Sequence, residues 1–206
     1  MPASSLNKQQ LRTRETHARL LDAAEKIFVG QGYEGAQLSQ IAAAAGRTKG
    51  AVYAHFRSKE DLFLALFAQR TRAYVARLLA AIETCTTRPQ RLRAFREFFI
   101  SLAANRTWPI LELEFKLFAL RHPESRQRLR QAFAASLPQN DDALYAQVFG
   151  PLSRTRRAQL DLAATALGPI VSGLILESHI EPQKLSEPNL RLLFGQIFDA
   201  LFPVPA

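Results

Sequence analysis

The sequence predicts an all-α protein, because helical periodicity runs through the chain and the usual signals of β structure are missing. Apolar residues recur at intervals of three and four along the long segments, and no run alternates strictly between apolar and polar residues. The turn dipeptides Asn-Gly and Asp-Gly, which often join strands in hairpins, do not occur. With 206 residues, 48% of them hydrophobic, the chain can bury a substantial core.

The first two predicted helices lie in the N-terminal part of the chain. Residues 20–28 carry apolar side chains at helical spacing, and Gly30 and Gly32 are expected to end this helix. Residues 38–45 form a shorter second helix with a single apolar stripe. Gly46 follows it and can adopt the left-handed conformation that ends many helices.

The next two helices are predicted from their N-terminal caps. Thr48 caps a third helix, in which Val52 and Phe56 point the same way because they are four residues apart. Residues 58–61, Ser-Lys-Glu-Asp, resemble a capping box and open a fourth helix that is expected to reach past residue 80.

Prolines mark the expected helix boundaries in the rest of the chain. A proline at the first helical position costs nothing, because its missing N–H would have no helical partner there. The predicted starts are Pro89, Pro109 and Pro123, with a break at Pro138 and a restart at Asn140 that lasts until Gly150. Two last helices are expected over residues 156–178 and 189–202, the first kinked at Gly168-Pro169.

Composition narrows the class of protein. The net charge of +9 favours anionic partners, nucleic acid first and a membrane surface second. No apolar run approaches the length of about 18 residues that spans a membrane, and the N-terminus lacks the apolar block of a signal peptide, so we expect a cytoplasmic protein without a membrane segment. Cys85 is the only cysteine, which excludes a disulfide or a cysteine-based zinc site within one chain.

Residues 37–56 have the outline of a helix-turn-helix, two short helices joined by a tight turn at Gly46-Arg47-Thr48. The outer face of the second helix is expected to present Thr48, Lys49, Tyr53 and His55. Gly50 carries no side chain there, which suits a helix whose N-terminal residues approach DNA bases and phosphates closely. This pattern predicts a DNA-binding element.

The same residues carry a family resemblance. The run Gly32-Tyr33-Glu34 followed by LSQIAAAAGRTKGAVYAHFRSKEDLF resembles the DNA-binding domain of the tetracycline-repressor (TetR) family, with motif residues at matching spacing over residues 20–66. The resemblance implies a three-helix helix-turn-helix domain joined by a long helix to a larger helical domain that binds ligands and dimerises. The domains expected from it are a flexible basic tail at 1–11, the DNA-binding domain at 12–72, and the effector-binding and dimerisation domain at 73–206.

The resemblance also implies roles for individual residues. Phosphate contacts are expected from Tyr53 and Lys59, and base or phosphate contacts from Thr48, Lys49 and His55. Two positions depart from the family pattern. Gln37 stands where the family usually has the threonine that caps the second helix and can hold a phosphate. Arg47 replaces an apolar turn residue, and either contacts DNA or only reaches solvent.

The larger half is rich in aromatic residues, which permits an apolar pocket between helices, although core packing is the commoner use of such residues. The candidate pocket residues are Asn105, Trp108, Glu112, Phe115, Phe118 and His122. They suit an apolar or aromatic effector, or a cationic one if a glutamate faces it. No cofactor or metal is expected, because the chain lacks the common nucleotide-phosphate and zinc motifs and its histidines are scattered.

The last two predicted helices each carry an apolar stripe that suits a homodimer, in which two helices from each chain form a four-helix interface. The candidate interface residues are Leu160, Ala164, Leu167, Val171, Leu174, Leu193, Ile197 and Leu201. These stripes could equally pack inside the monomer. A two-fold dimer would present two recognition helices to a palindromic site.

The sequence therefore predicts a homodimeric repressor that leaves a palindromic operator when a small apolar or aromatic effector binds. An alternative is a DNA-binding regulator that is ligand-independent or activating. A further alternative is an all-α enzyme or scaffold, but the chain has no G-x-S-x-G or other common catalytic motif, so we expect no enzymatic activity.

Overall fold

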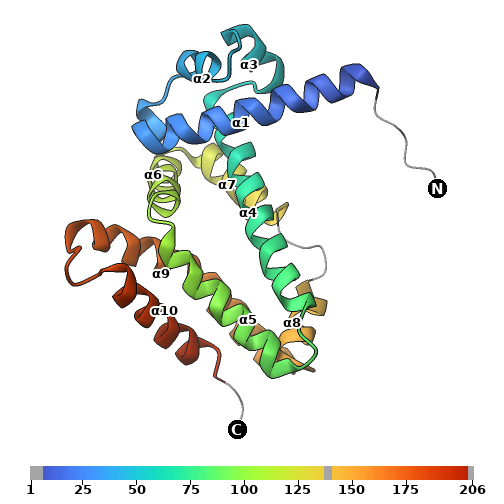
Figure 1. Cartoon of the computed structure of the whole chain (residues 1–206), viewed down its shortest axis with the longest axis vertical. Helices are drawn as coiled ribbons and strands as arrows, with labels where there is room; N and C mark the ends of the chain where they lie inside the picture. The colour runs from blue at the N-terminus through green and yellow to red at the C-terminus, as the bar shows by residue number, and fades with distance from the viewer. Residues whose placement is uncertain (1–6, 137–140, 204–206) are drawn as a thin grey trace. The chain divides into compact units, whose positions relative to one another are not determined.

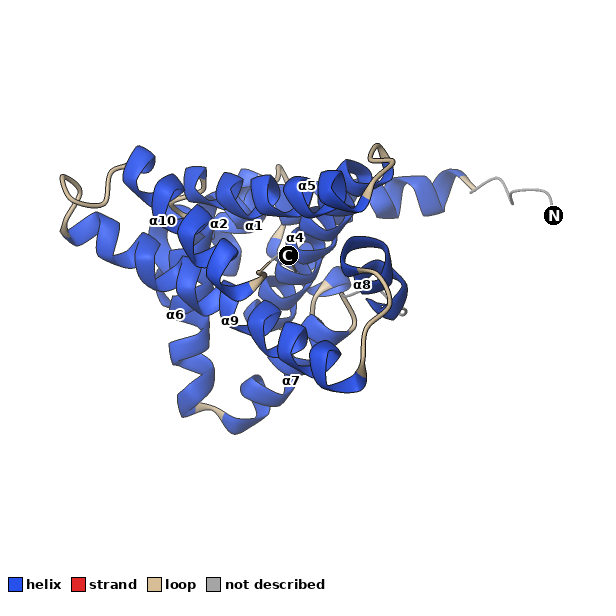
Figure 2. Ribbon diagram, turned by 90° about the horizontal axis from the view of Figure 1, so that it is seen from below, coloured by secondary structure: helices blue, strands red, loops and turns tan. Residues whose placement is uncertain are grey.

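The computed structural model describes residues 7–136 and 141–203, and within these ranges it contains helices and loops but no strand (Figure 2). The all-α prediction is confirmed. In chain order the helices are α1 (Lys8–Gly35), α2 (Leu38–Ala44), α3 (Lys49–His55), α4 (Lys59–Glu83), α5 (Arg88–Ser101), the 3-10 helix η1 (Leu102–Ala104), α6 (Trp108–Arg121), α7 (Pro123–Ala134), α8 (Asp141–Phe149), α9 (Arg154–Ile180) and α10 (Glu187–Leu201) (Figure 1).

The chain divides into two compact units. The first combines residues up to Arg70 with Glu114–Ala134, and the second combines Thr71–Leu113 with the residues from Ala135 onward. The division within α4 lies close to the boundary expected at residue 72. The grouping of residues 114–134 with the N-terminal unit was not predicted, because sequence order alone does not show which distant segments pack together.

Helix α1 starts earlier and ends later than the sequence indicated. The side chain of Asn7 caps it by accepting hydrogen bonds from the backbone N–H groups of Gln9 and Gln10, at 2.8 and 3.0 Å. Residues 8–11 are therefore helical, and the expectation of a flexible tail as far as residue 11 is wrong for them. Residues 1–6 lie outside the described ranges.

The predicted glycine stop in α1 is only partly right. Gly30 is helical, whereas Gly32 has φ 73° and ψ 172°, a local break before the helix assignment resumes as far as Gly35. This backbone conformation is essentially restricted to glycine, because a Cβ atom would clash with the neighbouring peptide groups. Gly32 therefore redirects the chain just before α2.

Aromatic residues form the core of the first unit. Phe28 of α1 and Phe63 of α4 pack edge to face with ring centroids 5.3 Å apart, and both are fully buried. Tyr33 contacts Phe63 at 5.2 Å and Phe115 of α6 at 4.8 Å. Such edge-to-face contacts are a favourable geometry for aromatic rings, and they fix the end of α1 against α4 and α6.

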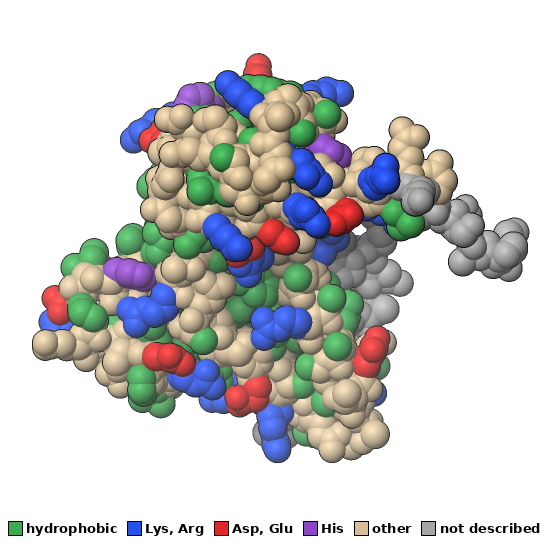
Figure 3. Space-filling view, turned by 45° about the horizontal axis from the view of Figure 1, so that its top comes forward, with side chains coloured by type: hydrophobic (Ala, Val, Ile, Leu, Met, Phe, Trp, Pro, Cys, Tyr) green, Lys and Arg blue, Asp and Glu red, His purple; other side chains and the backbone are tan. Residues whose placement is uncertain are grey.

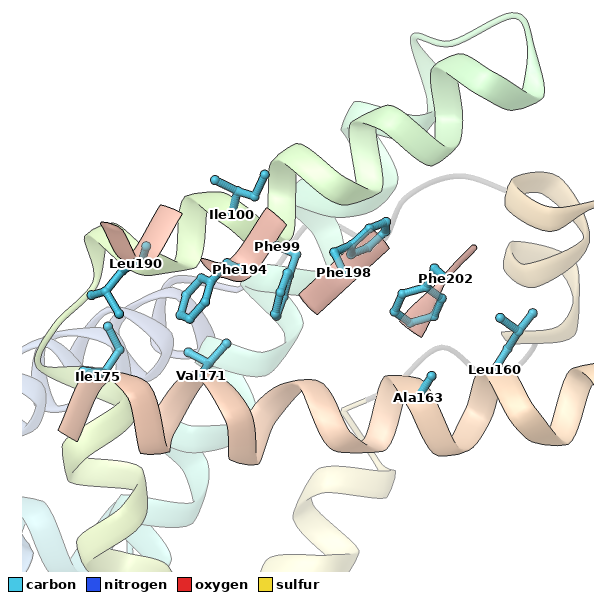
Figure 4. Packing of buried hydrophobic residues seen from close by; sticks show 11 residues of the cluster. Phe99, Ile100, Leu160, Ala163, Val171, Ile175, Leu190, Phe194, Phe198 and Phe202 are labelled. Carbon is cyan, nitrogen blue, oxygen red and sulfur yellow. The ribbon is translucent and has the colours of Figure 1, made fainter. Parts of the chain in front are cut away.

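The second unit has its own core, formed by α5, α9 and α10. In Figure 4, Val171 and Ile175 of α9 point toward Leu190 and Phe194 of α10. Phe99 of α5 lies 5.2 Å from Phe194 between ring centroids. All five side chains are buried, so the apolar stripes of both helices are used largely within one chain.

The remaining boundaries follow the sequence closely. The prolines predicted to start helices lie in the first turns of α5, α6 and α7, and the last two helices match their predicted ranges within a few residues. Helix α9 continues through Pro169, and η1 was not anticipated. The break expected at Pro138 and the restart at Asn140 lie outside the described residues.

Helix α9 bears on the expectation of a protein without a membrane segment. Over the described residues it is the one helix long and apolar enough to cross a membrane by length and composition, and 28% of its apolar window is buried within the chain. The sequence expectation was based on unbroken runs of apolar residues. Mean hydropathy over 18 residues can be high even when glycine, serine and threonine interrupt such a run. A core helix of a soluble protein can meet the same criterion.

Candidate nucleic-acid interface and cavity

The turn between α2 and α3 has the geometry that its sequence predicts. Gly46 adopts φ 64° and donates its N–H to the carbonyl of Ala43 at 3.0 Å, while the N–H of Arg47 reaches the carbonyl of Ala42 at 2.8 Å. Thr48 then caps α3 by accepting the N–H of Ala51 on its Oγ1 atom at 3.2 Å. The two short helices are thus joined by a fixed turn of four residues, 45–48.

Helix α3 has a buried and an exposed face. Val52 is fully buried and Phe56 nearly so, which anchors the helix to the N-terminal unit. Tyr53, by contrast, is 50% exposed, and the ammonium of Lys49 lies 5.8 Å from its ring centroid. Gly50 is also exposed at the start of the helix. The outer face therefore offers a cation, an aromatic hydroxyl and room for close approach.

The two positions that depart from the family pattern are both exposed. The backbone N–H of Gln37 donates a hydrogen bond to the side-chain Oε1 atom of Gln40 at 3.2 Å. Gln40, itself in the first turn of α2, therefore caps the start of that helix. The guanidinium of Arg47 lies against its own turn, where it donates to the carbonyl of Gly46 at 3.3 Å. Both side chains can reach an approaching molecule.

The structure gives Lys59 a role that the sequence did not predict. Its ammonium donates hydrogen bonds to the carbonyls of Glu34 at 2.9 Å and Ala36 at 3.1 Å, and lies 4.9 Å from the ring centroid of Tyr33. Partial burial lowers the pKa of this ammonium, an effect that nearby Glu34 opposes. Lys59 therefore fastens the connection between α1 and α2 and has less capacity for a phosphate contact than its position suggested.

His55 is partly buried beside a second histidine that the sequence reading missed. His17 of α1 has its ring centroid 5.9 Å from that of His55 and 4.9 Å from that of Phe56. Burial lowers the pKa of His17, and the charge of His55 lowers it further. Nothing in the local pattern marks His17, because it lies on another helix and meets His55 only through tertiary packing.

Basic side chains are not concentrated in one place on the face that Figure 3 shows. On the face seen in Figure 3, lysine and arginine side chains are spread over the surface, with acidic side chains between them. Net charge therefore does not locate the interface, which is distinguished by the exposed face of α3. Among the described residues, no group of three or more histidine, cysteine, aspartate or glutamate side chains is placed to hold a metal ion.

A cavity of about 180 Å³ lies within the second unit. Its lining is mainly apolar and includes three of the six predicted residues, Asn105, Trp108 and Glu112. The lining residues that the sequence did not assign to a pocket are Tyr74, Phe95, Phe98, Phe99, Leu102, Pro109, Leu167, Gly168, Val171 and Ser172.

The other three predicted pocket residues lie in the first unit. Phe115 stacks on Phe63 with ring centroids 4.2 Å apart, and Phe118 stacks on His122 at 4.1 Å. The prediction that these residues line the cavity is wrong. They share α6 with the lining residues, but the later turns of that helix belong to a different packing unit, which helical periodicity could not reveal.

Asn105 organises the polar part of the cavity. Its Nδ2 atom donates to the hydroxyl of Tyr74 at 2.8 Å, and its Oδ1 atom accepts the N–H of Trp108 at 3.1 Å, in the first turn of α6. Besides the predicted pocket residues, one sequence feature could have indicated this cavity, the pair Gly168-Pro169 within α9. Pro169 has no N–H to donate within α9, and Gly168 leaves open space that becomes part of the lining.

The predicted dimer residues divide between core and surface. Leu160 and Val171 are buried in the core of the second unit, so their assignment to an interface between chains is wrong. Four others are partly buried against the same core, namely Ala164, Leu167, Leu174 and Leu201, while Leu193 and Ile197 are half-exposed. The exposed leucine and isoleucine side chains of α9 are different ones, Leu162, Leu176 and Ile180.

Comparison with known proteins places the N-terminal unit in a family. The profile of the family described as bacterial regulatory proteins, tetR family, matches residues 20–66. Among curated relatives, the HTH-type transcriptional activator FasR of Mycolicibacterium smegmatis is 40% identical over 85 residues, which cover 41% of this chain and 39% of the relative. The fatty acid metabolism regulator protein of Bacillus subtilis is 28% identical over 120 residues, covering 57% of this chain and 60% of the relative.

Solved structures share the fold along most of the chain. The fatty acid degradation regulator FadR from Bacillus halodurans superposes with a TM-score of 0.68 at 21% identity, covering 90% of this chain and 94% of that one. FadR from Bacillus subtilis, solved with stearoyl-CoA, gives a TM-score of 0.65 at 22% identity, with 92% and 99% covered. The sequence alignments to these curated relatives span less than two thirds of each relative's length, and the relatives are named as regulators rather than enzymes.

The exposed α3 face, its fixed turn and the shared fold agree with this match, and residues 20–66 belong to the tetR family of bacterial regulatory proteins.

Proposed function

We propose that this protein is a homodimeric transcriptional regulator that binds a palindromic operator through α3 and releases it when a small apolar or aromatic molecule fills the cavity. The observation that carries the proposal is the exposed face of α3, with Lys49 and Tyr53 outward and Val52 anchored beneath. Such a protein would act in the cytoplasm, where DNA is accessible.

The geometry of α3 supports DNA binding. The N-terminal residues of a recognition helix contact base edges and phosphates in the major groove. Here Thr48, Lys49 and Gly50 lie at that end and are exposed. Tyr53 follows one turn later, and Gln37 and Arg47 are exposed before it, where they can hold phosphates. His55 is half-buried, so we assign it a contact at the edge of this face.

The exposed stripe of α9 supports a dimer. Leu162, Leu176 and Ile180 are exposed by 73%, 39% and 66%, and their spacing places them on one side of the helix. Gly173 lies on the same side with open space around it, which permits close approach of another helix. Exposed apolar surface of this kind marks interaction sites in soluble proteins.

The cavity supports regulation by an effector. A ligand that binds more tightly to a conformation with the wrong spacing of the two recognition helices shifts the protein away from DNA. Structurally related proteins were solved with small molecules, the transcriptional regulator FadR of Bacillus subtilis with stearoyl-CoA and the multidrug binding protein EbrR with imidazole.

We propose repression rather than activation, because release by an effector needs only a loss of DNA affinity. The relatives include a protein named as an activator, FasR, and one named as a repressor, AcnR of Corynebacterium diphtheriae. An activating regulator, or one that needs no ligand, is therefore the second candidate. An increase of operator affinity on effector binding would favour it.

The first experiment selects duplexes from a random DNA pool with the purified protein at about 0.15 M salt, where non-specific phosphate attraction is weakened. Enrichment of a palindrome is expected for the wild type and for Lys184→Ala, which changes a lysine that is remote in sequence and 77% exposed. It is expected to fail for the double variant Lys49→Ala/Tyr53→Ala. Equal enrichment by that double variant would contradict the assignment of α3.

The dimer is tested by sedimentation. The wild type is expected at twice the 23.1 kDa mass of one chain, and Leu176→Lys/Ile180→Lys at the mass of one chain. Leu117→Lys changes a leucine of α6 that is 52% exposed and serves as the control. A double variant that remained dimeric would place the interface elsewhere.

A further inference from the structure

We infer that the cavity of the second unit selects a molecule that is not anionic and that has a single aromatic ring and a hydrogen-bond acceptor, such as an aromatic ketone. This inference rests on the proposed function and makes the effector class specific. It follows from three properties of the cavity, namely its size, the chemistry of its walls and the direction of its hydrogen-bond donors.

Size sets the first limit. An engineered apolar cavity of about 150 Å³ in another protein binds benzene, and the cavity here is about 180 Å³. This volume holds one ring with a few additional atoms. A long acyl chain would extend beyond this volume, so we expect an effector smaller than the stearoyl-CoA bound by FadR of Bacillus subtilis.

The walls favour an aromatic ligand. Five aromatic side chains line the cavity, Tyr74, Phe95, Phe98, Phe99 and Trp108. Ring faces and edges carry opposite partial charges, so a ligand ring can pack on these side chains in offset or edge-to-face geometry. Aliphatic molecules of the same size would gain burial alone.

Two polar side chains of the cavity, Tyr74 and Asn105, can donate hydrogen bonds. The hydroxyl of Tyr74 accepts from Nδ2 of Asn105, so its own hydrogen is directed to another partner. The Oδ1 atom of Asn105 accepts the backbone N–H of Trp108, whereas an amide nitrogen carries two hydrogens and only one is used by Tyr74. A ligand acceptor near Tyr74 and Asn105 therefore finds two donors.

Charge excludes anions. The lining contains no lysine or arginine, and its one ionisable carboxylate is Glu112. A ligand carboxylate would be desolvated without a counter-ion and placed near a like charge, which is unfavourable. Glu112 already has an interaction within the protein, and a neutral ligand adds no like charge beside it.

The test compares three molecules of similar size: acetophenone, which has a neutral acceptor, ethylbenzene, which has none, and benzoate, which is anionic. Dissociation constants are measured by titration calorimetry without DNA. Trp108 is the only tryptophan of the chain and lines the cavity, so a change in its emission shows that binding occurs there. One neutral hydrogen bond corresponds to about fivefold in affinity. We expect acetophenone to bind at least fivefold more tightly than ethylbenzene and tenfold more tightly than benzoate.

Two variants test the donors. Tyr74→Phe removes the hydroxyl, and Asn105→Asp removes the amide donor while keeping an oxygen for the N–H of Trp108. Both are expected to abolish the advantage of acetophenone over ethylbenzene, while ethylbenzene still binds and shows that the cavity is intact. Tyr145→Phe is the matched control, because Tyr145 lies in the same unit outside the lining.

Three results would overturn the inference: benzoate binding as tightly as acetophenone, equal binding of acetophenone and ethylbenzene to the wild type, or an unchanged preference in both donor variants. These titrations contain no DNA. If they fail while a palindrome is still enriched from the random pool, the ligand class is wrong and the DNA-binding proposal stands. If acetophenone binds as expected but no duplex is enriched, the DNA-binding proposal fails alone.

Discussion

Replacing Gly32 by alanine should destabilise the N-terminal unit through one identifiable backbone position. Gly32 has φ 73° and ψ 172° and breaks α1 before the chain enters the helix-turn-helix. A Cβ atom at this position would lie 2.6 Å from Oε2 of Glu114. The same carboxylate oxygen accepts the backbone N–H of Tyr33 at 2.9 Å. The substitution therefore strains the backbone and displaces a hydrogen-bond acceptor.

The magnitude follows from these two effects. A non-glycine residue held in this region of φ and ψ costs about 1–3 kcal/mol. Loss of the hydrogen bond to the partly exposed Glu114 adds on the order of 1 kcal/mol. We expect Gly32→Ala to lower the free energy of unfolding by about 2–4 kcal/mol. Gly30→Ala, two residues earlier in the same helix, meets open space and should be stabilising by roughly 0.5–1 kcal/mol.

The assay is urea unfolding followed by circular dichroism, with the emission of Trp108 as a second probe. Circular dichroism reports helices of both units, whereas Trp108 lies in the second unit, so coincident transitions test whether the chain unfolds in one step. The double variant Gly32→Ala/Glu114→Ala separates the two effects, since its destabilisation should be less than additive. If Gly32→Ala were as stable as Gly30→Ala, the positive φ at Gly32 would not be a conformation on which the fold depends.

Three further predictions concern single side chains. Lys59→Met should lower the free energy of unfolding in urea by about 1–3 kcal/mol, because the ammonium of Lys59 donates hydrogen bonds to two backbone carbonyls. The control Lys49→Met, on the exposed face of α3, should change it by less than about 0.5 kcal/mol. Equal effects of the two substitutions would contradict the role given to Lys59. On the selected operator, Lys49→Met should reduce the slope of log affinity against log salt by about 1, and an unchanged slope would show that Lys49 contacts no phosphate. The pKa of His17 is lowered by burial and by the charge of His55, so the unfolded chain takes up the proton first as pH falls below about 6.5, and stability should decrease from there until the folded protein also protonates. This part of the pH dependence should disappear in His17→Gln and diminish in His55→Gln, and an unaltered pH profile in both would refute the assignment.

Several features of this protein are local and could therefore be predicted from sequence. Gly46 was expected to adopt a left-handed conformation and does so, because few other residues can end a helix in that way. Thr48 was expected to cap α3, and its hydroxyl accepts the N–H of Ala51. Val52 and Phe56 were expected on one buried face, since residues four apart in a helix point the same way. The helix-turn-helix, its outward residues and most helix boundaries depend only on such short-range effects.

Other features depend on which distant segments meet. The later turns of α6 pack within the N-terminal unit, so Phe115 lies on Phe63 instead of lining the cavity. The helical spacing of apolar residues is the same whether Phe115 packs in a core or lines a cavity, so the sequence could not distinguish the two. Leu160 and Val171 are buried within one chain, which leaves Leu162 and Ile180 exposed on the same helix, and sequence alone could not choose between these faces. Sequence by itself determined most of the secondary structure and the candidate DNA-binding face, because local backbone preferences govern them, and the spacing of motif residues in 20–66 indicated the family. The cavity lining, the role of Lys59 and the His17 contact were decided by tertiary packing, which brings together side chains that no short-range pattern connects.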